Sequence, residues 1–488
     1  MIPYFDDSHE IKSIKKIKKG KRIMKNKEKF YSITLVTMMM VLFIILASST
    51  ACAFSGKSHE NIISAPSITS GSGNFTDDQI LVSGASTVQS ATGTESTIQG
   101  TVPSIFETRI TTNLSDSALP VIYGNRIAWE DDRNGNWDVY IYDLSTKKEP
   151  HTTDKSNQYA PDIYGNRVVW TDERNGNGDI YLQDLSTSTQ TRITTNTAWQ
   201  WGPAIYGDKI VWTDERNVNG DIYMYDLYTK KERRITTNTA WQWDPAIYGN
   251  KIVWTDERNG NLDIYMYDLS TSKERRITTN ASDQYAPAIY GNRIVWMDGR
   301  NGGGFDEDYM PVGNWDIYMY DLSTSKEKRI TTNPSCSAEP AIYGNLIVWA
   351  DDRNGNWDIY LYDLGTYHES HTTDGSDQYF PDIYGNRIVW TDWRNGDTAD
   401  IYMGTLGPHA DFSAYPRSGY SPLKVTFTDK STSSPTSWKW SFGDGTYSTT
   451  KNPVHTYGKA GKYTVSLTVK NSSGSSTETK YQYIVLTK

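Results

Sequence analysis

Residues 245–280 read PAIYGNKIVWTDERNGNLDIYMYDLSTSKERRITTN. The stretch holds four short runs of alternating apolar and polar residues, at 245–248, 251–255, 264–269 and 275–279. Gly, Asn, Asp and Ser separate the runs, and these residues are typical of tight turns. The stretch therefore predicts four short antiparallel strands, each joined to the next by a turn.

This unit is repeated. Its Ile-Tyr-Gly-Asn/Asp tetrapeptide occurs seven times, about 42 residues apart except for one longer step, beginning at Ile122, Ile163, Ile205, Ile247, Ile289, Ile342 and Ile383. A period near 42 residues with four strands per copy is typical of β-propeller blades. The sequence predicts an all-β protein with a seven-bladed β-propeller over residues 105–407.

The phase of the repeat predicts how the ring closes. An outer-strand segment, Thr108–Thr112, precedes the first complete copy, and the last copy ends on its third strand at 400–406. Pairing these two segments leaves no bare edge. We expect the N-terminal segment to be the outer strand of the last blade.

The repeated motif Asp-x-Arg-Asn-Gly-Asn-x-Asp-Ile-Tyr resembles the repeat of TolB-type propellers. It is clearest at Asp131–Tyr140, Asp172–Tyr181, Asp256–Tyr265 and Asp351–Tyr360. Ile-Tyr-Gly-Asn replaces the Ser-Pro-Asp-Gly turn of that family, and its helper domain is missing. The resemblance implies the fold and a binding role, without TolB's own partner.

Residues 408–488 predict a second domain, an immunoglobulin-like β-sandwich of short alternating strands. Its Trp440–Gly445 run, His455-x-Tyr457 and Gly461-x-Tyr463 resemble a PKD domain, a module common on archaeal cell-surface proteins and in secreted bacterial enzymes. The resemblance implies a spacer or adhesive unit, with Asp444 and His455 as turn and packing residues.

The N-terminus resembles a targeting segment. Ten Lys/Arg within residues 12–29 precede an apolar run, Ile33–Ala47, and an Ala51-Cys52-Ala53 site. Residues 1–53 therefore predict a signal peptide or a membrane anchor, and the Ser/Thr/Gly-rich residues 54–104 predict a disordered linker. We expect an exported, extracellular or cell-surface protein that meets the membrane only through an uncleaved N-terminus. Sequons for glycosylation begin at Asn74, Asn113, Asn280 and Asn471.

The formal charge of −9 becomes −15 without the first 53 residues, and this acidity disfavours nucleic acid as a partner. The two cysteines, Cys52 and Cys336, exclude a disulfide scaffold. The Asp/Asn-rich turns, such as Asp131–Asp138, are compatible either with calcium binding or with a purely structural role. We favour structure, because calcium needs six to eight oxygens, and predict no metal or other cofactor.

Function is expected where the copies differ. Trp199 and Trp241 replace Asn or Asp in the loops that enter two adjacent blades, and blade five carries an insertion, Gly302–Gly313. Exposed aromatic rings beside carboxylates suit a glycan or a protein hot spot, although packing of both indoles on the blades is an equal alternative. The predicted binding residues are Trp199, Trp241, Phe305, Asp306, Glu307, Asp308 and Tyr309.

No catalytic motif accompanies the three propeller histidines, His151, His368 and His371. We therefore predict no catalytic residues and no enzyme. The expected role is non-catalytic binding of an envelope protein or glycan, or cell-envelope architecture. The alternative is a secreted carbohydrate-active enzyme, a polysaccharide lyase or hydrolase that uses the propeller face.

Overall fold

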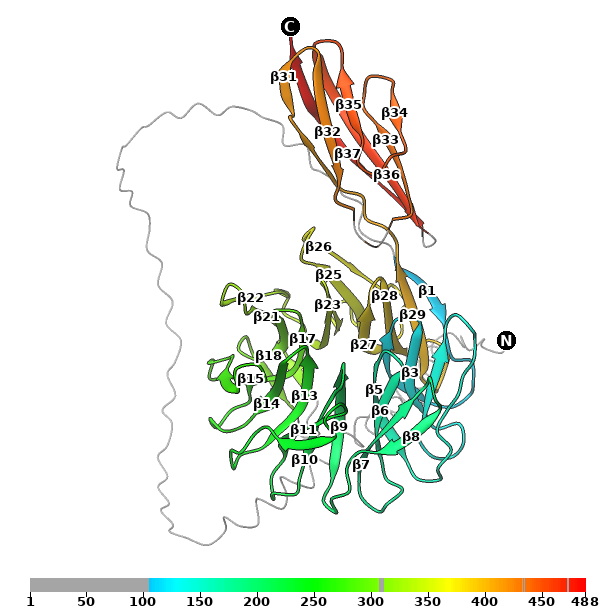
Figure 1. Ribbon diagram of the computed structural model, residues 1–488, viewed down its shortest axis with the longest axis vertical. Coiled ribbons are helices and arrows are strands. Elements are labelled where there is room, and N and C mark those ends of the chain that lie inside the picture. Colours follow the sequence, from blue (N-terminus) through cyan, green and yellow to red (C-terminus); the bar gives the residue numbers. More distant parts are fainter. Residues whose placement is uncertain (1–104, 307–310, 432, 434, 472–473) are drawn as a thin grey trace, which may run out of the picture. The chain divides into compact units, whose positions relative to one another are not determined.

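The computed structural model describes residues 105–488 apart from 307–310, 432, 434 and 472–473 (Figure 1). The expected signal segment 1–53 and linker 54–104, with Cys52 and Asn74, lie outside the described residues, as do Glu307, Asp308 and Tyr309. Every regular element in the described part is a strand. No helix in that part is long and apolar enough to cross a membrane.

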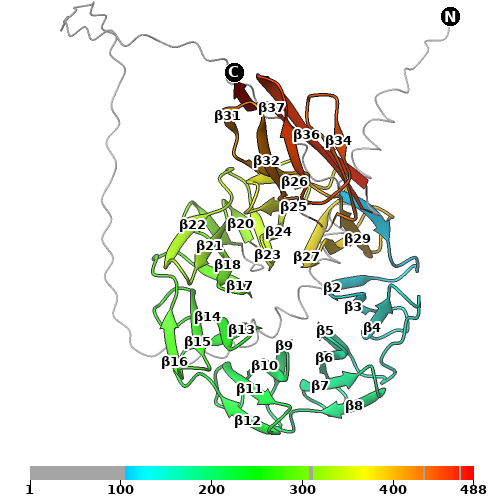
Figure 2. The ribbon, with the colours of Figure 1, turned by 45° about the horizontal axis from the view of Figure 1, so that its top comes forward.

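Seven antiparallel sheets are arranged as blades around a common axis, with the first strand of each repeat innermost (Figure 2). Blade 3 is representative, with the order β9 (Gln200–Tyr206), β10 (Lys209–Asp214), β11 (Asp221–Asp226) and β12 (Lys231–Arg234). The other blades are blade 1, β2 (Ser117–Tyr123), β3 (Arg126–Asp131) and β4 (Asp138–Asp143); blade 2, β5 (Gln158–Tyr164), β6 (Arg167–Asp172), β7 (Asp179–Asp184) and β8 (Thr189–Arg192); blade 4, β13 (Gln242–Tyr248), β14 (Lys251–Asp256), β15 (Asp263–Asp268) and β16 (Lys273–Arg276); blade 5, β17 (Gln284–Tyr290), β18 (Arg293–Asp298), β21 (Asp316–Asp321) and β22 (Lys326–Arg329); blade 6, β23 (Ser337–Tyr343), β24 (Leu346–Asp351), β25 (Asp358–Asp363) and β26 (His368–His371); and blade 7, β27 (Gln378–Tyr384), β28 (Arg387–Asp392), β29 (Asp400–Leu406) and β1 (Ile105–Arg109).

Blade 1 departs from the expected four strands. Its sheet contains only β2, β3 and β4, and the outer segment is reduced to an isolated bridge between Tyr140 and His151. Pro150 explains the difference. Its carbonyl accepts a hydrogen bond from the Ile141 amide at 2.9 Å, but proline has no N–H to donate in return.

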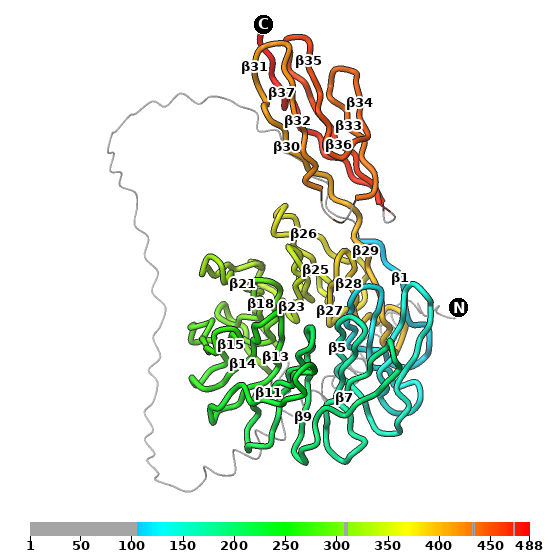
Figure 3. Tube along the Cα trace, viewed as in Figure 1, coloured from blue at the N-terminus to red at the C-terminus, as the bar shows by residue number. Residues whose placement is uncertain are grey.

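The N-terminal segment closes the ring as the repeat phase predicted, but its strand spans Ile105–Arg109 and not Thr108–Thr112. Strand β1 pairs antiparallel with β29, from Ile105 opposite Leu406 to Arg109 opposite Tyr402 (Figure 3). The pairing is extended by the Thr111 hydroxyl, which donates to Asp400 at 2.9 Å. Residues almost 300 positions apart in the chain thus complete one blade.

A ring of seven tyrosines joins the inner strands. Each innermost strand ends in Tyr, and the ring centroids of neighbours are 4.6–4.8 Å apart around the whole circle, including the pair Tyr123 and Tyr384 across the closure. Burial, followed by hydrogen bonding between neighbouring hydroxyls, raises the pKa of Tyr206 to about 12. Contacts between the seven phenol rings hold the blades together at one end of the axis.

Each blade also repeats one buried polar unit. In blade 4 the Trp254 indole N–H donates to Asp256 at 2.9 Å, and Arg258 binds the same carboxylate through two side-chain nitrogens and its backbone amide. Trp254 and Asp256 are fully buried, and the Arg258 guanidinium lies over Tyr265 at 4.2 Å. The second-strand tryptophans Trp129, Trp170, Trp212, Trp254, Trp296, Trp349 and Trp390 are all fully buried, which confirms them as core residues.

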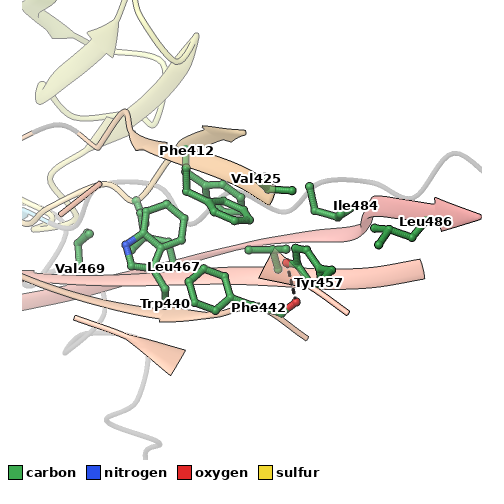
Figure 4. Close-up of a cluster of buried hydrophobic side chains, with 12 residues drawn as sticks. Phe412, Val425, Trp440, Phe442, Tyr457, Leu467, Val469, Ile484 and Leu486 are labelled. Atoms are coloured by element: carbon green, nitrogen blue, oxygen red, sulfur yellow. Dashed lines mark hydrogen bonds between the residues drawn. The ribbon is translucent and has the colours of Figure 1, made fainter. Parts of the chain in front are cut away.

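The C-terminal residues form the predicted β-sandwich. One sheet holds β30, β32 and β35, and the other holds β31, β37, β36, β33 and β34. Figure 4 shows its core, where Trp440 and Phe442 lie among aliphatic side chains and the buried Tyr457 hydroxyl donates to the Phe442 carbonyl at 2.9 Å. The strand bounds are β30 (Phe412–Tyr415), β31 (Ser418–Tyr420), β32 (Leu423–Asp429), β33 (Ser437–Ser441), β34 (Tyr447–Ser448), β35 (Val454–Tyr457), β36 (Gly461–Asn471) and β37 (Gly474–Thr487).

Removal of β1 should destabilise the propeller. A chain trimmed to begin at Asn113 loses the whole outer strand of blade 7 and leaves β29 as a bare edge. We expect a sharp drop in the melting temperature by circular dichroism, whereas a chain that begins at Ile105 keeps its transition. An unchanged melting temperature in the shorter chain would contradict this closure.

Candidate binding face of the propeller

The two ends of the axis differ in how much the blades vary. We call the end where each innermost strand begins the loop end, because the turns between second and third strands lie there too: the Glu173 amide in such a turn donates to Asn157 in the adjacent loop. The third, fifth and seventh residues of β2, β5 and β9 are the partly exposed ones. The seventh residue is always Tyr, while the third varies.

The third residue of each innermost strand adopts a left-handed backbone with φ between 50° and 60°. It sits at a β-bulge, which re-aims a side chain and is frequent beside functional sites. Asp244 is the only one of the seven that is exposed. The seven residues are Leu119, Ala160, Gly202, Asp244, Ala286, Glu339 and Phe380.

None of these third-position residues was among the binding residues predicted from the sequence. Each of these residues immediately precedes a proline that is present in all seven copies, so a variable residue stands between constant neighbours. That contrast was the available signal. The bulge could not be foreseen, because a left-handed backbone at Leu, Glu or Phe is uncommon.

Four carboxylates link neighbouring blades by hydrogen bonds, and the linked series runs from blade 6 to blade 7, across the ring closure to blade 1, and on to blades 2 and 3. Glu339 and Glu130 accept the backbone amides of Phe380 and Ala160 at 2.7 and 3.1 Å. The remaining two bonds run from Ile122 to Asp382 and from Ile205 to Asp162, each at 2.7 Å.

Burial governs the protonation of these carboxylates. It raises the pKa of Glu130 and of Glu339 to about 8, although the amide that each accepts lowers the pKa in part. Burial likewise raises the pKa of Asp162 to about 7 and of Asp382 to about 6. Solvent reaches the Asp244 side chain, but protein atoms also surround it, and the resulting desolvation raises its pKa to about 6. Burial therefore favours the protonated form of these carboxyl groups.

Trp199 and Trp241 lie against the turns of the preceding blades. A Cβ on Gly178 would meet the Trp199 ring at 2.6 Å, and one on Gly220 would meet the Trp241 ring at 2.7 Å. In blades 1 and 6 the indole comes from the turn itself, at Trp137 and Trp357.

Where the turn supplies the indole, the loop that follows carries Asn or Asp in place of Trp. The Trp137 amide donates to Asn157, and the Trp357 amide donates to Asp377 at 3.1 Å. At each of these four contacts between neighbouring blades, a single indole fills the space, and it comes either from the turn of one blade or from the loop that enters the next. Trp199 and Trp241 are both half-buried, so packing accounts for one face of each ring.

The blade 5 insertion is a small hairpin of β19 (Gly303–Phe305) and β20 (Pro311–Gly313). Phe305 packs on Trp315 and Tyr285, with ring centroids 5.0 and 5.7 Å away, while Asp306 is exposed. Phe305 therefore anchors the hairpin, and Asp306 is an exposed acidic residue within the part of it that the structure describes.

The three histidines are not brought together by the fold. His151 stacks on Tyr140 in blade 1 at 4.6 Å, and His371 stacks on Tyr360 in blade 6 at 4.8 Å. His368 begins β26, at the other end of that strand from His371. Both stacked rings occupy the place where other blades carry an arginine.

The sequon asparagines are engaged locally. The Asn113 amide donates to Asp131 at 3.0 Å, Asn280 accepts the Ser282 amide at 2.9 Å, and Asn471 donates to Ser433 at 2.7 Å.

The Asp/Asn-rich turns are held by contacts within the blade. Asn134 donates to Asp138 and to the Tyr140 hydroxyl, at 2.9 and 2.7 Å. Burial alone would raise the pKa of Asp131, but hydrogen bonds from Arg133 and Ser117 lower it to about 2. The turn oxygens thus have structural partners, and among the described residues no group of three or more His, Cys, Asp or Glu is placed to hold a metal ion.

In the sandwich, Asp444 accepts the Thr446 amide at 3.0 Å and pairs with His455 at 2.7 Å. His455 stacks flat on Phe442. These are the turn and packing contacts expected from the sequence.

Comparisons with known families agree with both folds. The model of the TolB beta propeller domain matches residues 120–305, and that of the PKD domain matches residues 409–486. The chain therefore contains a region that matches the TolB beta propeller domain and a C-terminal region that matches the PKD domain.

Among solved structures, an oligogalacturonate lyase in complex with manganese is similar at a TM-score of 0.50 and 14% identity, over 63% of this chain and 98% of that one. TolB from Acinetobacter baumannii gives a TM-score of 0.41 at 20% identity, over 54% of this chain and 67% of that one. At 14% identity, the similarity to the lyase shows the fold alone. Collagenase ColA of Bacillus cereus is 56% identical over 52 residues, which is 11% of this chain and only 5% of the collagenase.

The raised carboxyl pKa values predict how stability depends on pH. An acid whose pKa is higher in the folded protein stabilises the fold below the unfolded pKa, and this contribution is lost as the pH rises through the folded value. Between pH 5 and pH 9 we therefore expect the free energy of unfolding to fall. The opposite contribution of Asp131, with its pKa near 2, acts only below about pH 4.

The double variant Glu130→Gln with Glu339→Gln keeps an oxygen acceptor for each amide but cannot ionise. It should match the native protein at pH 5 and exceed it at pH 8.5 by about 2 kcal/mol or more, since one pKa unit corresponds to about 1.4 kcal/mol. Denaturant unfolding at the two pH values measures this difference. Parallel pH profiles for the two proteins would refute the assignment.

Proposed function

We propose that this is an exported cell-surface protein whose propeller binds a partner of the cell envelope, a protein or a glycan, without catalysing a reaction. The PKD domain serves as a spacer or adhesive unit. The alternative, a secreted carbohydrate-active enzyme that uses the same face, makes different predictions for the histidines.

One observation carries the proposal: among the three inner strands of the blades and their connections, variation is concentrated at the loop end. The buried Trp–Asp–Arg unit and the tyrosine ring recur in all seven blades, as a scaffold requires. The third-position residues, the two loop indoles and the blade 5 hairpin break that regularity at one end. A surface that differs around the ring can distinguish one ligand orientation from another.

The composition of the loop end favours recognition. Asp244 is an exposed carboxylate, and half-buried aromatic rings lie at Trp199, Trp241 and Phe380. Aromatic rings beside acceptors suit sugar rings and protein hot spots. The PKD domain supports a surface location, since such modules are common on exported proteins.

A glycan array probed with the intact protein, run beside an assay for polysaccharide cleavage, tests the proposal directly. Binding without cleavage supports it. Turnover of a bound polysaccharide would establish the enzymatic alternative.

The histidines provide a sharper test of catalysis. The variant His151→Ala, His368→Ala and His371→Ala should retain every measurable activity, because two of these rings stack on separate tyrosines in blades 1 and 6. Ligand binding and product release by the triple variant and the native protein are compared. Loss of turnover in the triple variant would contradict a non-catalytic role.

The loop indoles should contribute to binding. An indole in a recognition site can be worth about 2 kcal/mol, roughly thirtyfold in affinity. Trp199→Ala with Trp241→Ala should therefore weaken ligand binding strongly, and each substitution should destabilise the fold less than a core substitution, because both rings are only half-buried. Trp254→Ala, in the core, should instead destabilise the fold by about 3–5 kcal/mol.

A matched exchange separates packing from recognition. Gly178→Trp combined with Trp199→Asn reproduces in blade 2 the arrangement that blade 1 has with Trp137 and Asn157. This variant should fold as the native protein does while presenting its indole from the turn. If the alanine variant unfolds as readily as Trp254→Ala, the loop indoles are packing residues and the binding site lies elsewhere.

A further inference from the structure

The outermost strands of blades 3, 4 and 5 share an unusual charge pattern. Strands β12, β16 and β22 read Lys-Glu-Arg-Arg, Lys-Glu-Arg-Arg and Lys-Glu-Lys-Arg, and the first three residues of each are exposed. They form the outer edge of three consecutive blades (Figure 2). This edge is cationic on a protein whose body is strongly acidic.

The second and fourth side chains of each strand are neutralised. In blade 3 Glu232 pairs with Arg216 at 2.6 Å, and Arg234 pairs with the buried Asp221 at 2.8 Å. The equivalent pairs in blades 4 and 5 are Arg258 with Glu274, Arg276 with Asp263, Arg300 with Glu327, and Arg329 with Asp316. One face of each outer strand therefore carries no free charge.

The first and third side chains lie on the opposite face, because side chains alternate along a strand. We call these six residues the rim cations: Lys231, Arg233, Lys273, Arg275, Lys326 and Lys328. No salt bridge to any described residue is formed by them. This face is cationic in all three blades.

Contacts with the next blade hold the third-position cations in equivalent places. Arg233 lies over the Tyr267 ring at 5.1 Å, and Arg275 lies over Tyr320 at 5.2 Å. Lys328 lies 5.2 Å from the rings of both Tyr362 and Tyr367. A cation over an aromatic face keeps its charge and is directed by the ring.

One acid stands on the same face, and it does not cancel the charge. Asp226 is opposite Lys231 in the ladder, but it is also opposite Lys209 on its other side and accepts the Thr229 amide at 2.8 Å. In blades 4 and 5 the acids are Asp268 and Asp321, each likewise between two cations, Lys251 and Lys273, and Arg293 and Lys326.

Among the described residues, cations at both the first and the third outer position occur in these three blades alone. Blade 1 has the exposed Lys148 at the first position, where its carbonyl accepts the Asp143 amide, but Pro150 at the third. The first and third outer positions are Thr189 and Thr191 in blade 2, and His368 and Ser370 in blade 6. A general need for charge at the outer edge would place cations there as well. The rim cations are therefore a local feature, as expected of an interaction surface.

We propose that the rim cations bind an acidic polysaccharide that runs across the outer edges of blades 3, 4 and 5. A pair of rim cations recurs in each of the three blades, which suits a polymer with carboxylates or sulfates at wide intervals. Nucleic acid carries a phosphate charge every few ångströms and would be repelled more strongly by the acidic body. Because the blades are arranged around an axis, a flexible chain can follow their edges where a flat membrane cannot.

Exposed tyrosines flank the rim cations. Tyr228, in the turn before β12, is 86% exposed, and Tyr367, in the turn before β26, is 70% exposed. A phenol ring can pack on a sugar ring while the neighbouring cations meet its acidic groups. The surface lies at the outer edge and not at the loop end, so this inference stands independently of the proposed function.

The test uses the intact protein and alginate, a polymer of uronic acids, with dextran as the neutral polymer. The variant Lys231→Gln, Lys273→Gln and Lys326→Gln removes three rim cations and leaves the cation–tyrosine contacts in place. The control variant Lys147→Gln, Lys148→Gln and Lys155→Gln removes the same charge from exposed positions near blade 1. All three proteins are compared by affinity electrophoresis in gels that contain alginate.

We expect alginate binding by the native protein and no binding to dextran. The rim variant should bind about tenfold more weakly, since each exposed ion pair contributes a factor of a few, while the control variant binds as the native protein does. Equal weakening in both variants, unchanged binding in the rim variant, or no alginate binding by the native protein would overturn the proposal. Tighter binding of a single-stranded DNA oligonucleotide than of alginate would also overturn it.

Discussion

The carboxylate that ends the second strand of every blade is fully buried, and the whole propeller is organised around neutralising it. A buried carboxylate is costly unless it is paired and hydrogen-bonded. Each blade meets this requirement from within, by an indole N–H from the same strand and an arginine two residues further on. That arginine then lies over a third-strand tyrosine and reaches an acid of the outer strand in several blades. One buried charge thus fixes three of the four strands of a blade.

Between blades, the structure relies on substitutions that compensate one another. An indole from the turn is matched by Asn or Asp in the following loop, as at Trp137 and Asn157, and a glycine in the turn is matched by an indole in the loop, as at Gly178 and Trp199. The same space is filled in both cases from different positions in the chain. The choice changes which surface carries the exposed edge of the ring without changing the junction, so neighbouring blades can differ in recognition at little structural cost.

Periodicity made most of the fold predictable. The seven copies, the buried second-strand tryptophans and the pairing of β1 with β29 all follow from the phase of the repeat. Periodicity could not show the consequence of Pro150, where a single missing N–H shortens an outer strand to a bridge. It also could not show that Trp199 rests on a glycine of another blade, since that contact depends on the angle between sheets. The third-position residues were visible in the sequence as variation, but only the bulge revealed that they share one place near the axis.

The register of the closing strand has a mechanical consequence. Ile105, where the chain enters β1, is opposite Leu406, where the chain leaves β29. The two segments that lead away from the propeller therefore depart from the same end of one antiparallel pair. A pulling force between them would break the backbone bonds of that pair one after another from Ile105 towards Arg109, and would not load them all at once. Tension applied across the molecule would thus open blade 7 first.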